Sequence, residues 1–409
     1  MKFIKIAVIV LIIVCFASCK DSQEPETLGY VVAIGIDEAD DGEEGYNITL
    51  QFANPDRISG GSSESGGKGG EESIENITVL APSIYPAVNI ANHIISKKFV
   101  LSHTKLVVFS DAVAKSGIKD FLGEINRSSD IRPNIYFAVS KDAAKDFLEA
   151  VNPKTEVNPV RYYTMIFEND YSGFIPQNMG QDFCLFYDSS EKSAVMPLCA
   201  IKEEQKEIKP KEEDYQYKIA DSLAGELKET GNGIQVAGIA IFDGDIKISE
   251  IGDIKTELFN IVTGEYRNSF VTYRFSEMAE SPITVMQQQK RKPRIKVDTK
   301  GKAPKIKVTV FLEADISSSP EEAAIEGRIA EFEKAAEGAL EKRAEEFLEE
   351  TKRLGCDIVG FGSYAKRNFG RIEDFEKYDW KSAYKNAQIT VDANISVRRT
   401  GLLVRSDGK

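Results

Sequence analysis

Cys19 is the residue whose surroundings most clearly predict chemistry, because two small residues, Ala17 and Ser18, come directly before it. After a short positive segment, an uninterrupted run of small and apolar residues extends over Ile6–Ser18. This run has the length of a secretory signal core, whereas a helix that spans a membrane needs about 20 residues. We therefore expect residues 1–18 to be a signal peptide that is cleaved between Ser18 and Cys19, with lipid attached to the Cys19 thiol.

Lipid on Cys19 would hold the mature chain on the outer face of a membrane. A single acyl chain binds a bilayer only marginally, and the glyceride on a bacterial lipoprotein cysteine brings two chains. Residues 19–27 would then form a lipidated tether. Cys15 is a weaker candidate because Val14 before it is not small. An ordinary cleaved signal peptide and an uncleaved anchor are the alternatives, and the polar residues 20–24 do not favour an anchor.

The other residues that could do chemistry form no catalytic or metal-binding pattern. The two histidines, His93 and His103, have neither a histidine four residues away nor a nearby cysteine, so the spacing of a zinc site is missing. No Gly-x-Ser-x-Gly motif of a hydrolase occurs. The acidic turn at 37–44 lacks the spacing of a calcium-binding loop. We expect a protein that is not an enzyme and that holds no cofactor and no metal.

Composition restricts the partners further. The net charge is −13, and it becomes −15 when the two lysines of the signal peptide are removed. An acidic body of this kind is not expected to bind nucleic acid or to dock on anionic lipid through a basic patch. Three cysteines follow Cys19: Cys184, Cys199 and Cys356. Buried free thiols are the expected state, and a disulfide between Cys184 and Cys199 is the alternative.

Strands and helices alternate at close range in the first part of the chain, which predicts an N-terminal α+β domain over 28–202. It opens with a hairpin of two strands, 28–37 and 46–53, separated by an acidic turn. A stretch rich in Ser, Gly and Glu at 59–72 reads as a flexible loop. Residues 152–180 carry several aromatic side chains, and we expect them to cover the sheet or to meet a partner.

A change of composition marks the middle of the chain. Lys and Glu dominate after residue 203, and Gly231-Asn232-Gly233 ends the stretch, so we interpret 203–233 as a linker with a small helical insert. A C-terminal α+β domain is expected over 234–405. It begins with a hairpin turned at Asp243-Gly244-Asp245.

The clearest predicted element is a long amphipathic helix over 320–354. Ser319, Pro320 and Glu322 form the pattern of a helix start, and Gly355 supplies the stop. Its apolar stripe is expected to cover strands near 305–312 and 388–399, with coiled-coil binding to a partner as the alternative. The predicted fold is α+β and multidomain, with mixed and antiparallel sheets flanked by helices.

Several segments resemble, in their joint order, the C-subunit lipoproteins of spore germinant receptors, the Ger(x)C family. After Cys19 these segments are Leu28-Gly29, 33–37, 51–55, 102–109, 238–242, 357–362, Trp380-Lys381 and 398–401. The resemblance covers about residues 19 to 403. The atypical Phe16 before the cleavage site, the long loop at 59–72 and Cys356 are its departures from the family pattern.

The resemblance implies a non-catalytic subunit of a nutrient receptor in the spore inner membrane, needed for receptor assembly and germination. Its partners would be the two integral-membrane subunits, A and B, and the membrane itself through lipid on Cys19. Within the chain, Gly360, Phe361 and Gly362 are candidates for a loop that contacts a partner subunit. The alternative for these three residues is a tight turn after the long helix. Trp380 is expected to anchor the local core, with stacking on a ligand as the alternative.

A solute-binding lipoprotein that captures a small ligand for a membrane transporter is the competing hypothesis. It requires a deep cleft between two lobes, with polar groups that converge on the ligand.

Overall fold

The structure is a computed structural model that describes residues 27–400. Ser18 and Cys19 lie outside the described residues, as do the Ser/Gly/Glu loop and most of the expected linker. The ranges not described between 27 and 400 are 54–73, 153–155, 157, 170, 178, 203–221, 227–232, 276–277, 279–281 and 320–324.

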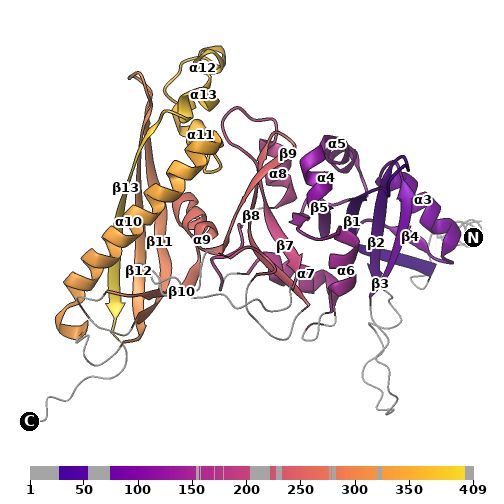
Figure 1. Ribbon diagram of the computed structural model, residues 1–409, viewed down its shortest axis with the longest axis horizontal. Coiled ribbons are helices and arrows are strands. Elements are labelled where there is room, and N and C mark those ends of the chain that lie inside the picture. Colours follow the sequence, from indigo (N-terminus) through magenta and orange to yellow (C-terminus); the bar gives the residue numbers. More distant parts are fainter. Residues whose placement is uncertain are drawn as a thin grey trace, which may run out of the picture.

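Two mixed sheets flanked by helices form the molecule, which confirms the predicted α+β class (Figure 1). The first sheet has nine strands in the order β3-β2-β1-β5-β6-β7-β8-β9, with β4 paired to β1. Its strands are β1 Leu28–Glu38, β2 Tyr46–Ala53, β3 Ile74–Ala81, β4 Lys98–Val100, β5 Leu106–Ser110, β6 Tyr136–Ser140, β7 Val195–Ile201, β8 Ile234–Asp243 and β9 Ile246–Ile251.

Helices cover both faces of the first sheet, and this explains why β5 and β6 are buried along their whole length. The helices α3, α4, α5 and α8 pack on one face and α6 and α7 on the other. The aromatic stretch after residue 152 contributes α7, whose tyrosines lie in the core. The helices are α3 Ile84–Ile94, α4 Asp111–Ser116, α5 Lys119–Arg127, α6 Ala144–Ala150, α7 Pro159–Phe167 and α8 Gly180–Phe186.

The second sheet has four strands in the order β10-β11-β12-β13. The long α10 crosses one of its faces, as Figure 1 shows, and its apolar stripe packs on the alternating inward residues of β12 and β13. The strands are β10 Asn268–Tyr273, β11 Ile283–Asp298, β12 Lys305–Ser318 and β13 Gln388–Arg399. The helices are α9 Asp253–Thr263, α10 Ile329–Leu354, α11 Phe361–Lys366, α12 Ile372–Tyr378 and α13 Trp380–Tyr384.

The long helix begins at Ile329, nine residues later than residue 320, the predicted start. A 3-10 turn at Ile325–Gly327 precedes it, and Arg328 has a non-helical backbone (φ −128°, ψ 21°). Its guanidinium pairs with Glu331 and donates to the carbonyl of Met278. The predicted cap residues Pro320 and Glu322 lie outside the described residues, whereas the predicted stop at Gly355 is confirmed, with a left-handed φ of 74°.

A row of glutamates on α10 covers the free edge of the second sheet. The N–H groups of Val391, Ala393, Ile395 and Val397 point away from β12 and donate to carboxylates at 3.0, 2.9, 3.0 and 2.8 Å. The acceptors are Glu345, Glu341, Glu337 and Glu333, in that order. Four helical residues rise about 6.0 Å and two strand residues about 6.6 Å, so the two repeats stay matched over the three steps that separate the four pairs. An edge that would otherwise invite pairing with another chain is closed.

The two sheets share one hydrophobic core around α9. Side chains of β7, β8 and β9 lie in the same cluster as those of the second sheet. β8 and β9 begin the expected C-terminal domain, yet they pair with β7 in the first sheet. The chain therefore passes from the first sheet to the second after β9. The division into domains at 203–233 stays a prediction.

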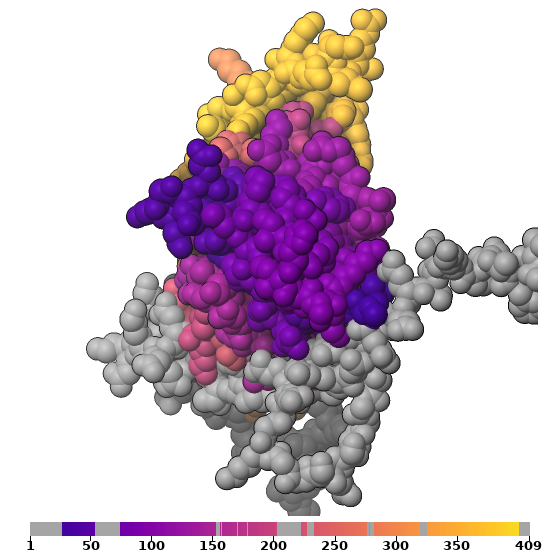
Figure 2. All heavy atoms as spheres, turned by 90° about the vertical axis from the view of Figure 1, so that its right-hand side faces the viewer, coloured from indigo at the N-terminus to yellow at the C-terminus, as the bar shows by residue number. Residues whose placement is uncertain are grey.

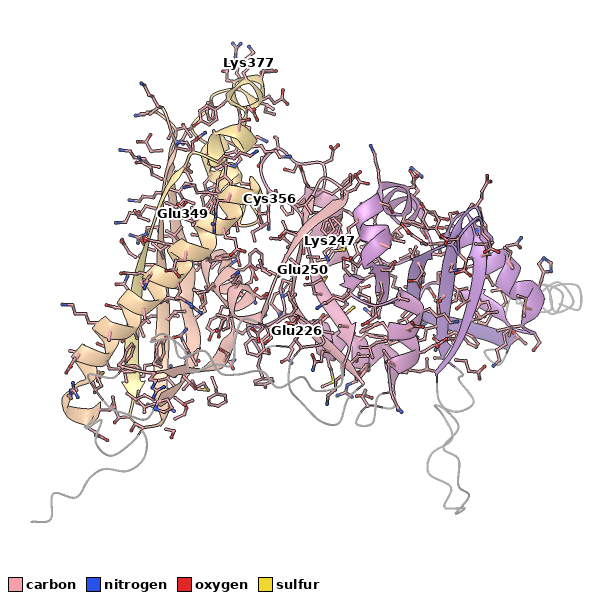
Figure 3. All side chains as sticks on the ribbon, viewed as in Figure 1. Glu226, Lys247, Glu250, Glu349, Cys356 and Lys377 are labelled. Carbon is pink, nitrogen blue, oxygen red and sulfur yellow. The ribbon has the colours of Figure 1, made fainter. Side chains whose placement is uncertain are left out.

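A lysine with two carboxylate partners links α4 to β9, the last strand of the first sheet. Lys247 is 5 % exposed, and its ammonium lies 2.5 Å from Asp111 and 2.7 Å from Glu250. Figure 3 labels Lys247 and Glu250.

Among the described helices, none is both long and apolar enough to cross a membrane.

Replacing a glutamate of the α10 row should weaken the covered edge. We expect Glu341→Ala to lower the free energy of unfolding by about 1 kcal/mol, because the N–H of Ala393 loses its acceptor. Glu341→Gln keeps an oxygen acceptor and should retain most of the stability. Urea denaturation measures both, and the exposed Glu346 supplies the control Glu346→Ala, with a change within about 0.5 kcal/mol. Equal losses in the alanine variants would show that the carboxylate row does not hold the edge.

Candidate functional site

The predicted partner-contact residues lie at the start of α11, where Gly360 is the N-cap and Phe361 and Gly362 are the first two helical residues. Gly360 has a left-handed backbone with φ 88°, and Phe361 is fully buried. Gly362 is also buried. Gly360 faces Lys192, and Gly362 faces the backbone of Glu191. The partner that they contact in this structure is thus the chain itself. A contact with another subunit stays a prediction.

Asp357 organises the turn before α11. Its Oδ1 accepts the N–H of Gly360 at 2.8 Å, and its Oδ2 accepts the N–H of Gly362 at 2.8 Å and the indole N–H of Trp380 at 2.9 Å. Burial raises the pKa of Asp357, while these N–H donors and the Phe361 N–H work in the opposite direction. Trp380 is only 2 % exposed, so it anchors the local core.

Polar contacts join the turn and the nearby helices to the first half. The N–H of Ser193 donates to the carbonyl of Asp357 at 2.8 Å. The hydroxyl of Ser363 donates to Glu191 at 3.0 Å, and Lys366 forms an ion pair with the same carboxylate. We call the surfaces that meet here, 187–193 with 243–244 and 355–362 with 380–384, the inter-sheet contact.

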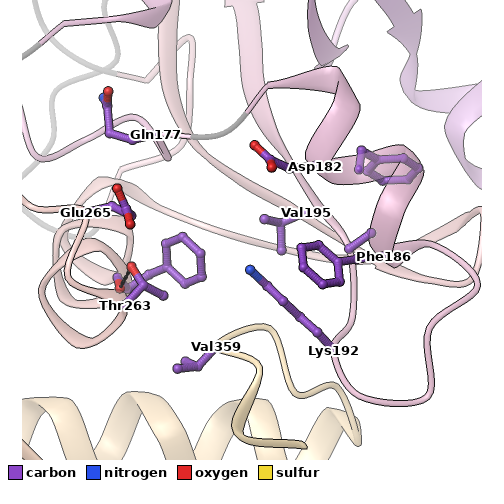
Figure 4. A pocket seen from close by; sticks show the side chains of 11 residues that line it. Gln177, Asp182, Phe186, Lys192, Val195, Thr263, Glu265 and Val359 are labelled. Carbon is purple, nitrogen blue, oxygen red and sulfur yellow. Dashed lines mark hydrogen bonds between the residues drawn. The ribbon is translucent and has the colours of Figure 1, made fainter. Parts of the chain in front are cut away.

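Two cavities open beside the inter-sheet contact. One, of about 290 Å³, lies between residues 187–193 and the helix α13. The other, of about 210 Å³, is bounded by α8, the start of β7, α9 and Val359 (Figure 4). Sites for drug-sized ligands have volumes of roughly 300–1,000 Å³. The larger cavity is near the lower limit of this range, and the smaller one lies below it.

Lys192 extends into the smaller cavity, as Figure 4 shows. Its ammonium lies 4.7 Å from the centre of the Phe186 ring, a cation–π distance. Burial lowers the pKa of Lys192, and the charges of Asp357, Asp182 and Glu265 act in the opposite direction. None of these carboxylates forms a salt bridge with the ammonium in the described part of the chain.

The sequence gives no signal for Lys192 or Glu191, because a lysine within Asp-Ser-Ser-Glu-Lys-Ser looks like part of a solvated loop. Asp357 belongs to a segment that the resemblance singled out. Two of its donors, Gly360 and Gly362, follow it closely in the sequence, whereas the third, Trp380, lies 23 residues away. Only the packing of the two halves brings these residues together.

The histidines and thiols take structural positions. His93 is exposed on α3, and the ring of His103 packs edge-on against Tyr30 at 4.8 Å. Partial burial, helped by the charge of Arg132, lowers the pKa of His103. In the described ranges no three metal-binding side chains gather into a cluster.

Cys184, Cys199 and Cys356 are free thiols in this structure, so a Cys184–Cys199 disulfide is not formed. Cys199 is buried in the first sheet, where its thiol donates to the carbonyl of Val139 at 3.5 Å. Burial raises the pKa values of all three thiols, which keeps them protonated.

Comparison with known proteins accounts for both halves of the chain. Residues 21–201 match the N-terminal domain of spore germination proteins, and residues 237–401 match the C-terminal domain described as spore germination B3/GerAC like. The chain belongs to the Ger(x)C family. Spore germination protein KC of Bacillus subtilis (strain 168) is 24% identical over 405 residues, which are 97% of this chain and 96% of that protein. The crystal structure of the GerBC protein shares 12% identity and covers 89% of this chain and 96% of that chain, with a TM-score of 0.49.

Substitution at Gly362 tests how tightly the inter-sheet contact of this Ger(x)C protein is packed. A Cβ there would lie 2.3 Å from the backbone oxygen of Glu191 and 2.7 Å from Trp380. We therefore expect Gly362→Ala to lower the free energy of unfolding by about 3 kcal/mol or more, measured by denaturant titration. Gly370→Ala is the matched control, because no atom lies within 4 Å of its Cβ position. A fully stable Gly362→Ala protein would contradict this packing.

The stability of a Trp380→Phe variant should depend on pH. A carboxyl group whose pKa is raised by folding makes the protein less stable as the pH rises from the ordinary value of 3.8 through the folded value. Loss of the indole donor raises the pKa of Asp357 further. The stability lost in Trp380→Phe, about 2 kcal/mol or more near neutrality, should thus grow as the pH rises through the raised pKa of Asp357.

Tyr384→Phe is the control for that experiment. It removes a hydroxyl that lies 2.7 Å from the Thr351 hydroxyl, and burial raises the pKa of Tyr384 above its usual range. Its stability loss should therefore be the same at pH 4 and pH 7. A Trp380→Phe loss that is equally constant would refute the coupling to Asp357.

Proposed function

We propose that this chain is the non-catalytic C subunit of a nutrient germinant receptor in the spore inner membrane, where it supports receptor assembly and germination. Lipid on Cys19 would hold it on the outer face of that membrane. Its partners would be two integral-membrane subunits, A and B.

The observation that carries the proposal is the match to two germination-protein domains in their family order, over 21–201 and 237–401. The similarity to spore germination protein KC extends over 97% of this chain. A germination role thus rests on the whole body of the protein and on no isolated motif.

The position of the first strand is compatible with the proposed anchor. The described chain starts at Thr27, directly before β1, and β1 lies in the half of the molecule remote from the second sheet (Figure 1). Figure 2 looks at this N-terminal half, with the C-terminal part behind and above it. A tether over 19–27 would hold the first sheet nearer the membrane and direct the second sheet outward.

Membrane anchoring would also assist assembly. Confinement beside integral-membrane partners raises the effective concentration, so contacts that are weak in solution can suffice. Three hydrophobic clusters form the cores within the described residues, so we expect the body to fold without the lipid.

Removal of the lipidation site separates placement from folding. We expect Cys19→Ala to lose lipid labelling and membrane association and to slow nutrient-triggered germination by about tenfold or more, the loss of effective concentration being the cause. The melting temperature of the body should not change. Cys184→Ala, which removes a free thiol of the body, is the control and should germinate normally. Wild-type germination by unlipidated protein at normal abundance would reject the proposed role of the anchor.

Deletion of the gene tests the germination role itself. Slower germination with at least one nutrient, restored by the wild-type gene, is the expected result. Two genes for membrane receptor subunits beside this one would support the proposal, whereas transporter genes would favour the solute-binding hypothesis.

A further inference from the structure

The cavity that contains Lys192 has an unusual balance of charges. Its wall includes one ammonium and two carboxylates, those of Asp182 and Glu265. Lys192 is half-buried, and among the described residues its ammonium has only the face of the Phe186 ring as a close partner. A charge that is partly removed from water and lacks a salt bridge costs free energy, so this position favours an anionic group supplied from outside.

The two carboxylates make a simple anion a poor occupant. Asp182 uses its Oδ2 to accept the N–H of Met179 at 2.9 Å, which leaves Oδ1 available. Glu265 lies at the mouth, with its side chain half exposed and 3.8 Å from Lys292. A ligand that carries only negative charge would be attracted by Lys192 and repelled by both acids, whereas a positive group on the same ligand would satisfy them.

Apolar side chains complete the cavity between the charged groups. Phe186 and Val195 come from the first half, Phe259 from α9 and Val359 from the turn before α11. At about 210 Å³ the space suits a ligand of a few heavy atoms with a short hydrocarbon part.

The lysine is held in place by packing. A Cβ at Gly360 would lie 3.0 Å from Cδ of Lys192. The absence of a side chain at Gly360 therefore leaves space for the aliphatic part of the Lys192 side chain. Because the stem rests on the turn that Asp357 organises, the ammonium is positioned before any ligand arrives. Such preorganisation reduces the entropic cost of binding.

We propose that this cavity binds a small zwitterion of the aliphatic amino acid class. Its carboxylate pairs with Lys192, its ammonium faces Asp182 and Glu265, and its side chain contacts Phe259 and Val359. The bound molecule touches both halves of the chain at the inter-sheet contact. The inference concerns binding by this chain alone and does not depend on the proposed germination role.

Equilibrium dialysis of the purified full chain in detergent with radiolabelled L-valine tests the site. We expect saturable binding with a dissociation constant in about the millimolar range, as befits a ligand of this size. Isovalerate lacks the ammonium and isobutylamine lacks the carboxylate, so each should compete about tenfold less well than unlabelled L-valine.

Two variants assign the binding to this cavity. Lys192→Met keeps the length of the stem and removes the charge, and it should weaken L-valine binding by about tenfold or more. Glu265→Gln changes a half-exposed side chain, so folding is not at risk, and it should weaken binding several-fold. Lys296→Met, at an exposed position on β11, is the control and should bind as the wild type does.

Three results would overturn the proposal. They are the absence of saturable binding up to about 100 mM L-valine, unchanged binding in a folded Lys192→Met protein, and competition by isovalerate equal to that by L-valine. The last result would make the cavity a site for plain carboxylates. Because no step involves spores, failure here would leave the gene-deletion experiment unaffected.

Discussion

The burial of α9 between the two sheets is the constraint on which the arrangement of the molecule depends. Nine of its residues are buried, including polar ones. Asn260 donates to the carbonyls of Gly173 and Ile175 at 3.0 and 2.9 Å, and Glu257 accepts from Ser269 of β10. One helix thus bonds to a loop of the first half and to a strand of the second. Since unpaired polar groups are costly in a core, these bonds fix how the halves meet.

Polar side chains also define the limits of the second sheet. The carboxylates of α10 end the sheet at β13 by occupying N–H groups that a further strand would need. Asp357 performs a comparable task at the end of α10, where its oxygens hold two backbone N–H groups and the indole of Trp380. In both places acids that look solvated in the sequence act as acceptors for backbone groups, and this gives the fold its specificity.

The inter-sheet contact is where structure and proposed function meet. It is built from segments distant in sequence, such as those of Glu191 and Gly362, and the cavity of Lys192 opens beside it. A molecule bound there would interact with both halves and would favour the arrangement that fits it best. A receptor subunit of this family could in this way respond to a small ligand without catalysing a reaction.

The sequence alone determined the elements and the kind of protein. Alternating apolar residues predicted the strands, the stripe and Gly355 predicted α10 and its end, and the ordered segments from Leu28-Gly29 to 398–401 indicated the family, because these signals are local or lie in a linear order. Tertiary structure alone decided that β8 and β9 complete the first sheet, that the helix starts at Ile329 and that the half-buried Lys192 extends into a cavity. These features depend on contacts between residues far apart in the chain, and no local pattern of hydrophobicity or charge encodes which distant surface a segment will meet.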